Sequence, residues 1–146
     1  CIRDSMIPVI IMASLTLLAS LTACKKDGGK TDERISKIAG LWTATYASFN
    51  GVDVVEEGGR VTLEIKDNGK FTFTIQRPER AAMVFTGTLG FDEEWLEVEY
   101  DNYPGEYEYY DISYDEQNLH IGANSDFDFD GDGTDEILIF FLDKVR

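Results

Sequence analysis

From about position 40 onward, apolar and polar residues alternate with a period of two. The pattern is plainest at residues 61–65 and 71–75, which flank Asp67-Asn68-Gly69. A period of two places alternate side chains on opposite faces of a strand, and Asn-Gly favours a tight turn because both residues tolerate positive φ. The sequence therefore predicts an antiparallel hairpin that turns at Asn68-Gly69.

Similar runs continue to the end of the chain, separated by turn signals. We expect eight strands, at residues 41–49, 61–65, 71–75, 82–89, 95–100, 106–114, 119–123 and 136–145. Adjacent tyrosines at 109 and 110 interrupt the alternation and predict a bulge. Residues 32–39 fit only one or two helical turns, and no helical period is long enough for a parallel crossover. The class is therefore antiparallel all-β, as a barrel or a sandwich.

The amino-acid composition excludes several classes of function. Lys and Arg number 13 against 28 Asp and Glu, a net charge of −15. Binding to nucleic acid, or to anionic lipid through a basic patch, needs clustered cations and is therefore not expected. The single histidine and two cysteines exclude a cysteine-based zinc cluster and offer no catalytic set, so we expect a protein that is not an enzyme.

The first segment has the pattern of a targeting signal. Residues 7–21 are uncharged and apolar, yet short for a membrane-spanning helix, and they lead into Leu21-Thr22-Ala23-Cys24. These four residues resemble the cleavage box of bacterial lipoproteins. The resemblance implies a signal peptide at 1–23, acylation of Cys24 with palmitate-type chains, and anchoring in the cell envelope. Residues 24–33 would form a flexible tether, and residues 34–146 the β domain.

Two features leave alternatives for this segment. An ordinary signal peptide with a chance cysteine, or a retained anchor, would have the same apolar run. Arg3 is offset by Asp4, so the basic region that usually begins a signal is weak, and Met6 is an alternative start.

Lys25 follows the cysteine, which by resemblance to lipoprotein sorting in enteric bacteria favours the outer membrane.

Gly40-Leu41-Trp42 opens the first strand after the short helical piece. A Gly-x-Trp there, followed by up-and-down strands, resembles the lipocalin and lipocalin-like barrels, in which the Trp closes one end. The resemblance implies an eight-stranded barrel that binds a small apolar ligand. The inward candidates are large: Phe71, Phe73, Phe85, Leu96, Val98, Tyr100, Tyr110 and Ile112. They leave open whether the interior holds a cavity or is filled by side chains.

An acidic loop precedes the last strand. Its proposed ligands are Asp128, Asp130 and Asp132 at positions 1, 3 and 5, the carbonyl of Thr134 at position 7, and Glu136 at position 9. Alternate carboxylates with Gly133 at position 6 follow the logic of calcium loops, and the pattern resembles FG-GAP and EF-hand-type loops. A register that starts at Asp126 also fits, and a solvated acidic turn is the alternative to a metal site.

Other polar clusters are weaker. Glu93, Glu94, Glu97 and Glu99 fit a solvated strand face better than a pair of catalytic acids. His120 has no ligand companion nearby, and the tyrosines at 103, 107, 109, 110 and 114 fit sheet packing or a sugar- or protein-binding surface. Two functions result: an envelope lipoprotein that binds a small apolar ligand, or a structural lipoprotein with a filled core that binds a protein or glycan.

Overall fold

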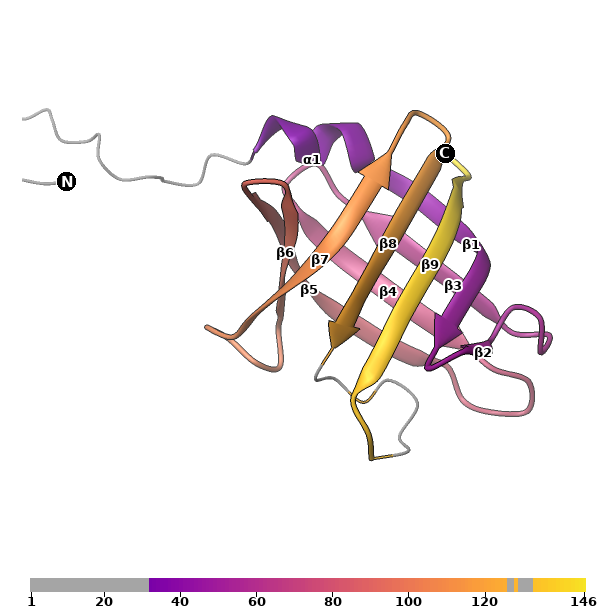
Figure 1. Cartoon of the computed structure of the whole chain (residues 1–146). Helices are drawn as coiled ribbons and strands as arrows, with labels where there is room; N and C mark the ends of the chain where they lie inside the picture. The colour runs from indigo at the N-terminus through magenta and orange to yellow at the C-terminus, as the bar shows by residue number, and fades with distance from the viewer. Residues whose placement is uncertain (1–31, 126–127, 129–132) are drawn as a thin grey trace, which may run out of the picture. The chain divides into compact units, whose positions relative to one another are not determined.

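The computed structural model describes residues 32–125, 128 and 133–146, which form an antiparallel β-barrel (Figure 1). Its strands are β1 (Gly40–Phe49), β3 (Arg60–Ile65), β4 (Lys70–Gln76), β5 (Met83–Asp92), β6 (Trp95–Tyr100), β7 (Tyr107–Tyr114), β8 (Asn118–Ser125) and β9 (Glu136–Lys144). Each strand pairs with its successor, and β1 also pairs with β9, so eight strands close into a barrel. The predicted antiparallel all-β class is confirmed, and its architecture is an up-and-down barrel rather than a sandwich.

Two short elements complete the fold. Helix α1 (Glu33–Ile38) precedes β1, with Asp32 as its N-cap accepting a hydrogen bond from the backbone N–H of Arg34 at 2.8 Å. Strand β2 (Val52–Asp53) pairs with the end of β1. The sequence did not predict β2, because two residues are too few for a periodic signal.

The predicted hairpin joins β3 to β4, with its turn at residues 66–70. Only Gly69 adopts a positive φ, of 89°, whereas the side chain of Asn68 accepts a hydrogen bond from the N–H of Lys70 at 3.0 Å. A Cβ at position 69 would lie 2.7 Å from the carbonyl oxygen of Leu89. Both backbone conformation and close approach therefore require glycine here.

The predicted bulge at the paired tyrosines is wrong. The ladder between β6 and β7 runs without a register shift from Leu96↔Tyr110 to Glu99↔Tyr107. Tyr109 faces solvent and its hydroxyl donates to Glu97 at 3.2 Å, while Tyr110 is buried. Ordinary alternation thus accommodates both rings.

Helix α1 and the first residues of β1 seal one end of the barrel. Trp42 is fully buried, and its indole N–H donates to the carbonyl of Ile38 at 2.8 Å. The Lys144 ammonium lies 5.1 Å from the indole ring and donates to the carbonyl of Ala39 at 2.9 Å. Ile35 and Ile38 on α1 are also fully buried. These contacts close the end near α1 (Figure 1).

Candidate functional site

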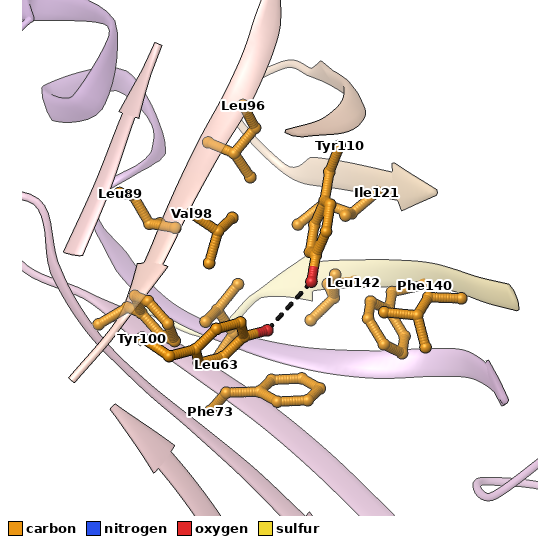
Figure 2. A pocket seen from close by; sticks show the side chains of 12 residues that line it. Leu63, Phe73, Leu89, Leu96, Val98, Tyr100, Tyr110, Ile121, Phe140 and Leu142 are labelled. Atoms are coloured by element: carbon orange, nitrogen blue, oxygen red, sulfur yellow. Dashed lines mark hydrogen bonds between the residues drawn. The ribbon is translucent and has the colours of Figure 1, made fainter. Parts of the chain in front are cut away.

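The barrel interior is almost filled. Figure 2 shows apolar and aromatic side chains from β3 to β9 converging on the barrel axis. The remaining space is about 40 Å³, room for roughly three water molecules. Phe140 lies 5.3 Å from Phe73 and 5.4 Å from Phe49 between ring centroids, so large rings occupy most of the centre. Of the two alternatives for the interior, this volume favours a filled core.

The barrel wall has a seam between β7 and β8. Their ladder extends only from Asp111↔Gly122 to Tyr114↔Leu119. Residues 107–110 of β7 pair with β6 instead, and residues 123–125 of β8 pair with β9. Figure 1 shows the two strands diverging toward the end opposite α1. Side chains rather than backbone hydrogen bonds therefore connect the wall there.

Four side chains form a hydrogen-bonded network at this seam. The hydroxyls of Tyr100 and Tyr110 lie 3.1 Å apart (Figure 2), and Tyr110 also donates to Glu108 Oε1. Ser125 donates to the same oxygen at 2.7 Å. Burial is the main cause that raises the pKa of both phenols above their ordinary value. The network thus holds two neutral tyrosines and a half-buried carboxyl beside the apolar core.

The inward positions of Tyr100 and Tyr110 were predicted from the sequence, whereas Glu108 and Ser125 were not among the predicted site residues. The signal for Glu108 was present, because positions 108, 110 and 112 share the inward face of one strand. Ser125 lies beyond the predicted end of its strand, and only the fold brings it 2.7 Å from Glu108.

The proposed calcium loop lies partly outside the described residues, which exclude Asp130 and Asp132. A carboxylate oxygen of Asp128 accepts a hydrogen bond from the N–H of Gly133 at 2.6 Å. This bond brings position 1 next to position 6, and Gly133 has a φ of 86° as a sharp turn requires.

Glu136, the predicted ninth position, lies at the start of β9 and is only 1% exposed. The side-chain amide of Asn50 donates to its carboxylate at 2.8 Å and to the carbonyl of Asp135 at 3.0 Å. Asn50 also accepts from the N–H of Ile137 at 2.6 Å. Asn50, which directly follows β1, therefore connects that end of β1 to the base of the acidic loop. Thr134 is exposed.

The outer face of β7, β8 and β9 carries a hollow of about 410 Å³. Asp111 and Glu94 line one side, Ile139 and Phe141 line the other, and Gly122 lies between them. Ile139 is 39% and Phe141 42% exposed, and both lie on the outward face of β9, so they give the hollow an apolar edge. We call this hollow the outer groove.

Other predicted residues are dispersed. Cys24 lies outside the described residues. Glu93 and Glu94 are exposed and Glu97 and Glu99 half-buried on the outward face of the β5–β6 hairpin and β6, as expected for a solvated face. His120 lies on the rim of the outer groove, its ring 4.6 Å from that of Phe141. Among residues 32–125, 128 and 133–146, no group of three potential metal-binding side chains converges.

The same described part contains no helix with the length and apolar character needed to cross a bilayer. Comparison with protein-family models, with curated proteins and with solved structures finds no match. The barrel is compatible with a lipocalin-like architecture, and that likeness rests on the strand topology and on Trp42 alone.

Proposed function

We propose that this chain is a lipid-anchored bacterial envelope protein, without enzymatic activity, that binds a partner protein on the outer groove. The contrast between the filled interior and the exposed apolar side chains of the outer groove carries the proposal. Ligand pockets usually enclose about 300–1,000 Å³, whereas the interior offers only about 40 Å³. The outer groove is an open hollow of about 410 Å³. Exposed apolar side chains beside a hollow are typical of protein-binding surfaces.

The anchor belongs to the same proposal. Leu21-Thr22-Ala23-Cys24 after an apolar run supports acylation of Cys24, and Lys25 favours the outer membrane. Two or more acyl chains give stable anchoring. We expect Cys24→Ser to release the protein from the membrane fraction and to block incorporation of labelled palmitate. A variant that stays in the membrane fraction would contradict the anchor.

A photo-crosslinker tests the binding face. We would place p-benzoylphenylalanine at Ile137 of β9, next to the outer groove, and at Val84 of β5 as a matched control. The two positions are 56% and 58% exposed, so accessibility is equal. We expect one discrete crosslinked protein in the native envelope from position 137 and none from position 84. Equal patterns, or none from either, would contradict it.

A small apolar ligand inside the barrel is the second candidate. The seam at residues 107–110 and 123–125 favours it, because no ladder joins β7 to β8 there, and side chains that fill the seam can move without breaking backbone hydrogen bonds between these two strands. Movement of Tyr110 toward solvent would enlarge the apolar cavity that its ring now lines. Release of a stoichiometric apolar molecule from the denatured, membrane-purified protein would support this function over the first.

We also propose one structural calcium ion in the loop, held by Asp128, Asp130, Asp132, Glu136 and the carbonyl of Thr134. Binding to the folded state alone stabilises by about 2.7 kcal/mol at a hundredfold excess over Kd. The Tm should therefore rise with calcium, and Asp130→Ala should remove most of the rise while Glu97→Ala does not. Ionic strength must be fixed with a monovalent salt. Identical melting curves with and without calcium would leave only a solvated acidic turn.

A further inference from the structure

The glycine in the middle of β8 has no structural reason to be glycine. Gly122 is not among the residues with positive φ, and a Cβ there would approach nothing nearer than the carbonyl oxygen of Leu138 at 3.6 Å, an ordinary contact. Glycine in a strand interior weakens the strand. In contrast, Gly87 on β5 could not accept a Cβ, which would lie 2.2 Å from a backbone oxygen. The missing side chain at 122 keeps the outer groove open.

The two sides of the outer groove differ in chemistry. Asp111 pairs with Gly122 on one side and Ile139 pairs with it on the other, so a carboxylate and an aliphatic side chain flank the same glycine. Glu94 adds a second carboxylate. Phe141 extends the apolar side, with Tyr46 at 5.3 Å between ring centroids.

The carboxylates of the outer groove are not neutralised from within the described part of the chain. Among those residues, neither Asp111 nor Glu94 forms a side-chain hydrogen bond or an ion pair, and the ion pair seen there joins Arg34 to Asp32. Arg34 also donates to the carbonyl of Glu93 and lies 4.2 Å from the Phe91 ring. The guanidinium of Arg34 is thus engaged by Asp32, the carbonyl of Glu93 and the Phe91 ring.

From these observations, and resting on the proposed function, we propose that the outer groove receives an arginine side chain of the partner protein. The aliphatic stem of arginine packs on apolar surface while its head reaches polar groups. Here the stem would cross Gly122 against Ile139, and the planar guanidinium would pair with Asp111 and Glu94. Arginine matches carboxylates in two-pronged geometry, which a lysine ammonium does not.

A matched pair of peptides tests this chemistry. The probes are acetylated and amidated Thr-Val-Arg-Val-Thr and the same peptide with citrulline, which is neutral and isosteric, in place of arginine. Each is titrated into the ¹⁵N-labelled full chain in non-ionic detergent at 0.15 M salt. We expect the arginine peptide to shift the amide signals of residues 120–122 and 139, and to bind about tenfold more tightly than the citrulline peptide.

Charge variants distinguish a local ion pair with the arginine peptide from a general effect of the protein's net charge. Asp111→Asn should weaken binding of the arginine peptide about fivefold or more, whereas Glu64→Gln, on β3 outside the outer groove, should change it less than about twofold. Both substitutions alter net charge equally. Gly122→Val should abolish binding by filling the outer groove, with the Tm retained.

Three outcomes would overturn the inference: equal affinity of the two peptides, equal effects of Asp111→Asn and Glu64→Gln, or no shift at residues 120–122. The photo-crosslink from Ile137 reports separately on the proposed function. If Ile137 crosslinks a partner but the arginine and citrulline peptides bind equally, the proposed arginine is wrong, whereas the proposed binding face remains supported. No crosslink from Ile137 would refute the binding face itself.

Discussion

Apolar side chains have different roles in the interior of the barrel and on its outer face. Inside, Phe73, Phe140 and their neighbours fill the space to about 40 Å³ and stabilise the fold. Outside, Ile139 and Phe141 remain exposed beside a glycine that the backbone does not require. Substitutions inside should therefore change stability, and substitutions outside should change binding with stability preserved.

The largest expected effect is at the sealed end. Trp42→Ala removes the largest fully buried side chain and its hydrogen bond to Ile38. We expect a loss of about 3–5 kcal/mol in the free energy of unfolding, measured by urea titration. Trp95→Ala, at a 42% exposed tryptophan, is the control and should cost far less. Equal losses would show that the seal contributes little.

The base of the acidic loop should give the next effect. Asn50→Gly keeps access to the native φ of 52° and removes three side-chain hydrogen bonds, including that to the buried Glu136. We expect a loss of about 1–3 kcal/mol, because a buried carboxylate loses a donor. Gly51, the next residue, has φ 88° and open space around its Cβ position, so Gly51→Asn is a mild control. Chemical denaturation that shows no change for Asn50→Gly would contradict this role.

A smaller effect is expected at the seam. Tyr110→Phe removes a hydroxyl that contacts Tyr100 and Glu108, and should cost about 1 kcal/mol at pH 7. Because the network lies beside the ladder between β7 and β8, the variant should also show faster exchange of the backbone amides of residues 111–114. Unchanged exchange rates would show that the network does not hold the strands.

Alkaline pH tests the same tyrosines. The pKa of Tyr100 and Tyr110 is raised in the folded state, mainly by burial, so folding favours the protonated phenols. The resulting stability is complete below the unfolded-state pKa of about 10 and falls as pH rises above it. Urea titrations at pH 9, 10 and 11 should show a decline, and a shallower one for Tyr110→Phe. A parallel decline in both proteins would exclude Tyr110 as its source.

The smallest effect on stability is expected for a substitution in the outer groove. Gly122→Val should change the free energy of unfolding by no more than about 0.5 kcal/mol, because valine suits a strand and its Cβ meets no close contact. Gly87→Val on β5 is the matched opposite and should destabilise strongly, since the Cβ would overlap a backbone oxygen. Thermal melts of the two variants compare them directly. Strong destabilisation by Gly122→Val would give that glycine a structural role instead.

Local patterns in the sequence predicted the parts of the fold that depend on neighbouring residues. The hairpin at Asn68-Gly69, the eight strands and the position of Trp42 all follow from alternation and short motifs. The bulge at Tyr109 and Tyr110 was wrong, because two rings can lie on opposite faces of an unbroken strand.

The sites were less predictable, because they join distant residues. Glu108 meets Ser125 only where β7 and β8 diverge, and Asn50 reaches Glu136 only because β1 closes the barrel against β9. The outer groove depends on the register that aligns Asp111, Gly122 and Ile139 across three strands. Register between distant strands is not encoded in any one segment.

Native mass spectrometry of the protein purified from its own membranes tests the central claim, that the barrel is a filled scaffold and binding occurs outside. We expect the mass of the mature chain from Cys24 with its acyl chains and one calcium ion, together with a complex that contains a partner protein. The Gly122→Val protein should lose that complex and keep the other masses. A stoichiometric small apolar molecule that is released only on unfolding would contradict the account.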